Sequence, residues 1–133
     1  MKALWLRWRG DPLRWTLWVI AAGTFLSGLF LIVFQKVVLD WLSAPTTTSD
    51  RLFFAIIGMF MAIVGGTLAQ DLWGRPHRFV VGWSALQKAC ASAAMSLAVA
   101  LSVFSYYGIV LAAFDFCSAL LAIGYWWRIR GAR

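Results

Sequence analysis

The chain has 133 residues, of which 62% are hydrophobic and only 13% carry a charge. Soluble domains usually contain about 25% charged residues, and a chain of this size could not bury so much apolar surface without lipid around it. Twelve Lys and Arg against five Asp give a formal net charge of +7. Because these basic residues flank apolar stretches instead of covering a soluble domain, nucleic acid is not expected as a partner.

Four apolar stretches follow one another along the chain, each approaching the length of about 20 residues that a helix needs to cross the hydrocarbon core. The first is too long for the core of a secretory signal, so it is taken as a span. We therefore predict an all-α integral membrane four-helix bundle that forms a single membrane domain over residues 1–133. The predicted spans cover residues 13–38, 51–70, 81–104 and 109–127.

Capping residues and turns mark the limits of these spans. Asp11-Pro12 predicts the start of the first helix, because Asp caps free amides and Pro is tolerated at the first helical position. The polar loop before the second span offers Ser49 or Asp50 as a cap. The tight turn at 105–108 predicts that the last two spans form an antiparallel hairpin of packed neighbours.

Basic and aromatic residues predict how the bundle is oriented. Cytoplasmic loops carry an excess of Lys and Arg, and Trp is enriched at membrane interfaces. One side of the predicted bundle has nine basic residues and eight Trp, which places the N-terminus and the C-terminus in the cytoplasm, beside anionic lipid, in the inner (plasma) membrane. These residues are Lys2, Arg7, Arg9, Arg14, Arg75, Arg78, Arg128, Arg130 and Arg133, with Trp5, Trp8, Trp15, Trp18, Trp73, Trp83, Trp126 and Trp127, against Lys36, Arg51 and Trp41 on the other side.

Asp115 is the most informative polar residue, because it lies well inside the fourth apolar stretch. A central Asp costs about 2.5–3.5 kcal/mol on insertion, so such residues face a partner or a water-filled cavity. Counting the helical rise places Ser27 and Ser96 at a similar depth, near Gly28 and Gly58. We expect a polar layer there, in which Asp115 is hydrogen-bonded between helices, transfers protons, or contacts another subunit.

Lys88 is the second charged residue expected inside the membrane. Its most natural partner is Asp71, at the cytoplasmic end of the second span, because Asp115 differs from Lys88 in depth by about 10 Å on the helical rise. Gln70 and Gln87 are expected to complete a cytoplasmic-side cluster with Asp71 and Lys88. Such a cluster predicts a structural clasp, with ligand binding as the alternative.

Small residues at four-residue spacing predict where helices pack closely or where a second copy binds. Cys90 and Cys117 are expected at similar depth, as apolar filler or as a redox pair. Lys36 and Asp40 have the spacing of a helical ion pair. The small residues are Gly23, Ser27 and Gly28 in the first span, Gly58, Gly65 and Gly66 in the second, and Ala85, Ala89, Ser92, Ala93, Ser96 and Ala100 in the third.

The layout resembles the small four-helix bacterial membrane proteins grouped as DoxX-like. The shared features are a Gly-rich second span, Gln87-Lys88 near the start of the third, Asp115 in the fourth and the aromatic-basic end 126–128. The resemblance implies a four-helix bundle, and a few members are linked to quinone-coupled sulfur oxidation. Small multidrug transporters also have four short helices, but they carry a membrane-embedded acid in the first helix, which this chain lacks.

Three functions compete on this sequence. The preferred one is an accessory or scaffold subunit that packs against itself or another membrane protein. The alternatives are a proton-coupled small-solute transporter that titrates Asp115, and a quinone-linked membrane oxidoreductase subunit that uses Cys90 and Cys117. No catalytic constellation, metal motif or cofactor-binding motif stands out in the sequence, so no cofactor is expected and enzymatic activity is the less favoured class.

Overall fold

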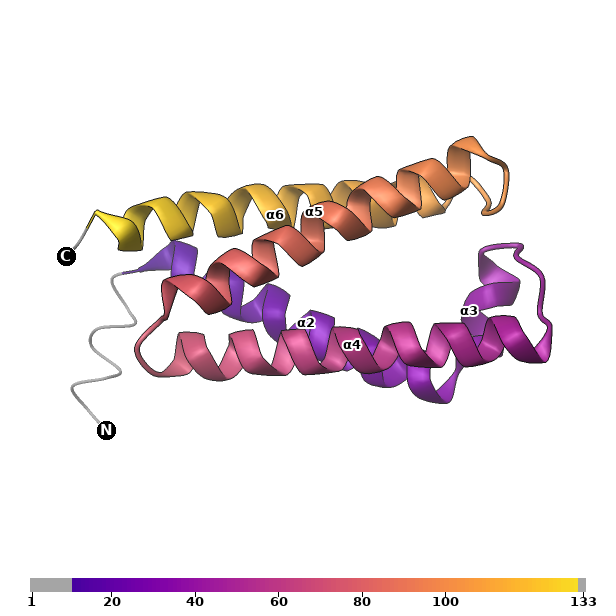
Figure 1. Cartoon of the computed structure of the whole chain (residues 1–133), viewed down its shortest axis with the longest axis horizontal. Coiled ribbons are helices and arrows are strands. Elements are labelled where there is room, and N and C mark those ends of the chain that lie inside the picture. Colours follow the sequence, from indigo (N-terminus) through magenta and orange to yellow (C-terminus); the bar gives the residue numbers. More distant parts are fainter. Residues whose placement is uncertain (1–10, 132–133) are drawn as a thin grey trace.

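The computed structural model describes residues 11–131, which form helices joined by loops (Figure 1). Four long helices and one short helix follow the chain in order. They are α2 (Pro12–Val33), α3 (Gln35–Trp41), α4 (Thr48–Trp73), α5 (Arg78–Ala100) and α6 (Gly108–Arg130).

The long helices form two antiparallel pairs, α2 with α4 and α5 with α6 (Figure 1). At one end, called here the base end, an ion pair joins Asp11 before α2 to Arg128 near the end of α6. The start of α2 and the end of α6 therefore lie at the same end of the bundle. At the opposite, far end the loop after α5 touches the loop after α3, where Ser105 N donates to Leu42 O at 2.8 Å. The predicted hairpin of the last two spans is confirmed.

Glycines let α2 and α4 approach to backbone contact. A Cβ added to Gly28 would lie 2.5 Å from both Ala62 N and Gly58 O, and one added to Gly65 would lie 2.6 Å from Phe25 N. Small residues at such positions allow the close packing that stabilises helices in lipid. The predicted contacts at these glycines are confirmed. Other small residues are exposed and make no close helix contact within the described chain, so contact with a second copy stays a prediction there: Gly23, Ser27, Ala89, Ala93, Ser96 and Ala100.

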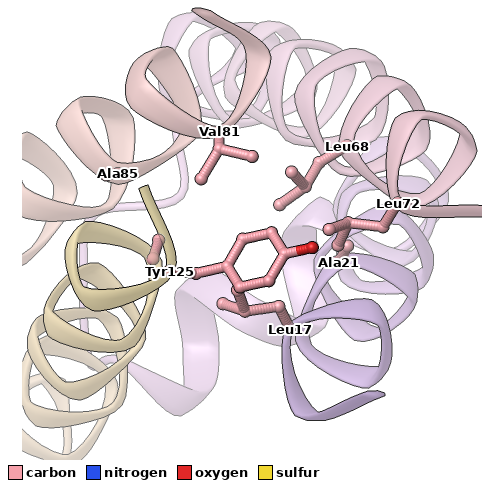
Figure 2. Packing of buried hydrophobic residues seen from close by; sticks show 8 residues of the cluster. Leu17, Ala21, Leu68, Leu72, Val81, Ala85 and Tyr125 are labelled. Carbon is pink, nitrogen blue, oxygen red and sulfur yellow. The ribbon is translucent and has the colours of Figure 1, made fainter. Parts of the chain in front are cut away.

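The two pairs meet in the half of the bundle near the base end. There Tyr125 of α6 lies among aliphatic side chains from all four long helices, including Leu17 of α2, Leu72 of α4 and Val81 of α5 (Figure 2). These four side chains are at most 3% exposed. The cluster is the main contact that holds one hairpin against the other.

The predicted first span of residues 13–38 is wrong at its far end, where the helix breaks. Phe34 leaves the helical conformation with φ −116° and ψ 37°, and α3 starts anew at Gln35. The Gln35 side chain donates to Ile32 O, which satisfies one carbonyl that the break exposes. The short α3 buries Leu39, followed by Leu42, over the far end of the bundle.

The helix starts agree with the sequence at α2 and differ at α4. Asp11 caps α2 by accepting from Arg14 N at 3.2 Å, as predicted. At α4 the cap is Thr47, so the prediction of Ser49 or Asp50 is wrong by two or three residues. Asp50 instead completes a capping box by accepting from Thr47 N at 3.0 Å.

Three helices, α2, α4 and α6, are long and apolar enough to cross a membrane by length and composition. The chain is thus a small multi-pass membrane protein. α5 is 23 residues long and runs beside α6. Because Lys88 and Gln87 lie in its middle, its mean hydropathy is lower than that of the three membrane-length helices, and it is not among them. The predicted third span, 81–104, is shorter at its far end, because α5 ends at Ala100.

Gly28→Ala is expected to lower the free energy of unfolding by about 1–3 kcal/mol, because the new methyl group overlaps the α4 backbone. Gly23→Ala is the matched control, since Gly23 lies on the same helix with nothing within 4 Å of an added Cβ. Unfolding of the purified protein in detergent, followed by circular dichroism, measures both. Equal stability of the two variants would contradict the backbone contact.

Candidate functional site

Two charged side chains lie together between α5 and α6. Lys88 Nζ donates to Asp115 Oδ1 at 2.6 Å, and the two form an ion pair. The Lys88 side chain is 8% exposed and that of Asp115 is 20% exposed. Both belong to the stripe of residues along which the two helices face each other, beside buried Ser92 and Ala112.

The register of the hairpin explains why these residues meet. Gly82 packs against Trp126 near the base end, and Ser92 Oγ donates to Ala112 O at 2.8 Å further along. Interpolating between these contacts places Lys88 level with about residue 118. Asp115 is then about 5 Å further along the axis, a distance that the lysine stem spans. The depth difference of about 10 Å expected from the sequence was too large.

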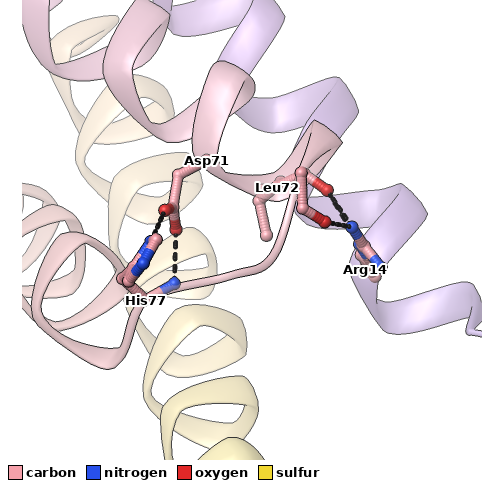
Figure 3. A network of polar contacts seen from close by, with 5 residues as sticks. Arg14, Asp71, Leu72 and His77 are labelled. Carbon is pink, nitrogen blue, oxygen red and sulfur yellow. Dashed lines mark hydrogen bonds and ion pairs between the residues drawn. The ribbon is translucent and has the colours of Figure 1, made fainter.

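Asp71, the partner that the sequence favoured for Lys88, binds elsewhere. Its carboxylate accepts from His77 N at 2.8 Å and contacts His77 Nδ1 at 2.6 Å across the loop between α4 and α5 (Figure 3). Gln70 is exposed, and Gln87 Oε1 is buried without a partner among the described residues. The predicted cluster of Gln70, Asp71, Gln87 and Lys88 is therefore wrong. His77 and Asp71 form a clasp that closes the loop instead.

The predicted polar layer around Asp115 is also wrong in its members. Ser27 and Ser96 are exposed and make no hydrogen bond to Asp115. Gly28 and Gly58 pack against each other between α2 and α4. Counting the helical rise gives the depth of a residue along its helix, but depth says nothing about which face of the helix the residue occupies.

A different set of hydroxyls borders the ion pair. Thr24, Ser84 and Ser118 line a small cavity together with Lys88, between α2, α4, α5 and α6. Thr24 and Ser118 donate to carbonyls of their own helices, Ile20 O and Phe114 O. The cavity has a volume of about 10 Å³, close to the room that one water molecule needs. It is too small for an organic solute.

Arg14 is a buried cation that sequence reasoning placed at the membrane surface. It is 7% exposed, although it stands one turn into α2. Its guanidinium donates to Leu72 O through Nε at 2.8 Å and through a second nitrogen, and to Gly74 O at 2.7 Å (Figure 3). Arg14 thus satisfies carbonyls at the end of α4 that have no partner within their own helix. The sequence places Arg14 and the helix end at Gly74 on the same predicted side of the bundle, and this was the signal that could have indicated the contact.

The remaining predicted residues stay apart. Lys36 and Asp40, both within the described part of the chain, form no ion pair, and Asp40 accepts weakly from Thr46 Oγ1 at 3.4 Å. Cys90 and Cys117 are exposed and not joined in a disulfide. Among residues 11–131 no group of three or more His, Cys, Asp or Glu is placed to hold a metal ion. Some predicted interface residues lie outside the described residues: Lys2, Trp5, Arg7, Trp8, Arg9 and Arg133.

Comparison with known proteins adds no family to this geometry. No family model, no curated protein and no solved structure matches the chain. What the fold establishes is a small all-helical membrane protein with three helices of membrane length.

Arg14→Lys is expected to lower the free energy of unfolding by about 1–3 kcal/mol, because a lysine cannot reproduce the forked contacts and leaves a buried carbonyl with fewer donors. The control is Arg75→Lys, since Arg75 is exposed in the loop after α4 and forms no hydrogen bond with a described residue. Thermal unfolding in detergent compares the two. A larger loss at Arg75 would contradict the assigned role.

Lys88→Met and Asp115→Leu are each expected to lower the free energy of unfolding by about 3 kcal/mol, because either change leaves an unpaired charge in a low-dielectric site. The double variant is expected to be more stable than either single one, since no charge then remains. A double-mutant cycle in detergent measures the coupling.

Arg128→Gln serves as the reference for an accessible pair. The Arg128 side chain is 56% exposed in its ion pair with Asp11, and loss of such a pair costs about 1 kcal/mol or less.

If the effects of the Lys88 and Asp115 changes on the free energy of unfolding were additive in the double-mutant cycle, the two side chains would not be paired in the folded protein.

Proposed function

We propose that this chain is an accessory or scaffold subunit in a membrane, which packs against a second copy or another membrane protein. The observation that carries the proposal is the contact between Lys88 Nζ and Asp115 Oδ1 at 2.6 Å. A carboxylate that carries protons or couples to a substrate has to change its charge during the cycle. Here a buried ammonium neutralises it within its own helical hairpin, as a structural pair does.

The cavity beside the ion pair supports the same proposal. With a volume of about 10 Å³ it has room for about one water molecule, next to Lys88 rather than Asp115. Solute-binding pockets are usually about 300–1,000 Å³. Apolar packing centred on Tyr125 closes the base half of the bundle.

The proposed topology has four crossings with both ends in the cytoplasm. α4 ends at the base end, where Arg14 binds Gly74 O, and α6 begins at the far end, beside the contact of Ser105 with Leu42. If α4 and α6 both cross the bilayer, the α5 segment between them has to cross it as well. The charge difference between the two ends favours the base end in the cytoplasm and the bacterial inner membrane as the location. The DoxX-like layout agrees with four crossings and brings no activity with it.

A proton-coupled transporter is the second candidate, and the exposure of Asp115 is the observation that favours it. One fifth of this side chain remains accessible although it lies within a helix of membrane length. Opening of the Lys88 contact would free a carboxylate that reaches the surrounding lipid or water.

Proton flux in proteoliposomes separates these two functions. The purified protein is reconstituted into vesicles with an internal pH-sensitive dye, and a pH gradient is imposed. An accessory subunit is expected to give no more dye response than empty vesicles, with the wild type and with the Lys88→Met/Asp115→Leu double variant alike. Native mass spectrometry of the same samples is expected to show an assembly larger than the monomer in both.

A flux in the wild type that Asp115→Asn abolishes, while the variant keeps its helical content, would overturn the accessory role in favour of transport. A protein that remains monomeric from detergent through bilayer nanodiscs would independently contradict packing against a second copy. The double variant controls for misfolding, because it removes both charges together and avoids an unpaired charge inside the membrane.

A further inference from the structure

Two arginines lie at the base end of the α5–α6 hairpin, one on each helix. A Cβ added to Gly82 of α5 would lie 3.3 Å from Trp126 Nε1 of α6, so these residues are in contact across the hairpin. Arg78 precedes Gly82 by four residues and Arg130 follows Trp126 by four. Because the helices are antiparallel, both arginines lie about one turn beyond the same contact, at the same level on neighbouring helices.

Neither arginine has an acidic partner in the described part of the chain. The acids near the base end are Asp11, which binds Arg128, and Asp71, which binds His77. Arg78 and Arg130 are exposed and form no hydrogen bond or ion pair with a described residue. Two positive charges therefore stand at the same end of the hairpin with their donors available.

Aromatic rings hold both guanidinium groups. Arg78 lies over the ring of Phe79 with 4.9 Å from Cζ to the ring centroid, and Arg130 lies 5.3 Å from the ring of Trp126 and 5.7 Å from that of Trp127. Such cation–π contacts leave the edges of the guanidinium free to donate. Each guanidinium is thus restrained against an aromatic ring of its own helix before any ligand arrives.

The start of α5 adds to the positive potential between them. His77 occupies the position before the helix, and no side chain there accepts from the first amides of α5. These amides carry the positive end of the helix dipole, which favours a phosphate or other anion nearby. The feature reinforces the two arginines, which supply the main charge.

Exposed rings place this cluster at the depth of lipid headgroups. Phe79 is 67% exposed, Trp83 is 69% exposed and Trp127 is 62% exposed, all within about two turns of Arg78 or Arg130. Large aromatic side chains that remain exposed at the end of membrane helices belong at the interface between acyl chains and headgroups. The anion available to this cluster at the depth of the headgroups is the phosphate of a lipid.

We infer that the base end of α5 and α6 is a binding site for one anionic phospholipid. Arg78 and Arg130 bind its phosphate together with the start of α5, while its acyl chains follow the exposed face beside Trp83. The site is more specific than the diffuse attraction that the net charge of +7 gives the whole protein. It does not depend on whether the chain is an accessory subunit or a transporter.

Lipid binding by native mass spectrometry tests this site. The purified protein in mild detergent is titrated with phosphatidylglycerol and, separately, with phosphatidylcholine. The wild type is expected to retain one phosphatidylglycerol in preference to phosphatidylcholine. Arg78→Gln/Arg130→Gln is expected to weaken phosphatidylglycerol binding about 25-fold, from the contribution of each basic residue near an anionic headgroup.

Two controls separate the site from general charge. Lys36→Gln/Arg51→Gln removes the same charge from the far end, and Arg75→Gln removes one from the base end outside the cluster; both are expected to bind phosphatidylglycerol like the wild type. Helical content and unfolding temperature without added lipid show that each variant is folded. Should the double arginine variant misfold, Arg78→Gln and Arg130→Gln are compared singly, with about 5-fold weaker binding expected for each.

Equal weakening by the control variants would overturn the site in favour of non-specific attraction. The inference would also fail if the wild type bound phosphatidylcholine as well as phosphatidylglycerol, or if loss of both arginines left the retained lipid unchanged.

Discussion

A charge buried between helices needs a partner from the protein, and the contact of Lys88 with Asp115 meets that need for two charges at once. Because the partners belong to neighbouring helices, the contact also fixes the register of α5 against α6. The same requirement explains Arg14, whose buried guanidinium satisfies the carbonyls at the end of α4. The Lys88–Asp115 pair and Arg14 each join two helices. Hydrophobic packing alone would let these helices slide against each other, because lipid is as apolar as the side chains it replaces.

The bundle is stronger within its hairpins than between them. The α2–α4 pair depends on glycines that admit backbone contact, whereas the α5–α6 pair depends on hydrogen-bonded polar side chains. The pairs meet mainly around Tyr125 near the base end, and at the far end α3 and its following loop join them through Leu42 and Ser105. A protein built in this way has a firm base end, where its two hairpins share a core.

Hydropathy and turn residues were enough to predict the helical class, the antiparallel final hairpin and the approximate extent of the long helices, because these depend on local sequence. The partners of the charged residues could not be predicted in the same way. Counting the helical rise gave depth but not the face of each helix, so Ser27 and Ser96 were grouped with Asp115 although both are exposed. Asp71 was assigned to Lys88 because the short loop that brings His77 back onto Asp71 has no periodic signal. The break at Phe34 lacks Pro or Gly, the residues that usually announce one.

The position of Lys88 has a consequence for how the protein is made. During synthesis α5 emerges before α6, and its lysine then has no carboxylate to meet until Asp115 follows 27 residues later. A segment with an unpaired charge and modest hydropathy partitions poorly into lipid by itself. On the proposed topology α5 therefore enters the bilayer together with α6, as a preformed hairpin in which the two charges already cancel. Among the residues that the structure describes, the first hairpin contains no such charge pair between its helices, because its contacts are glycines and the hydrogen bonds from Arg14 to backbone carbonyls.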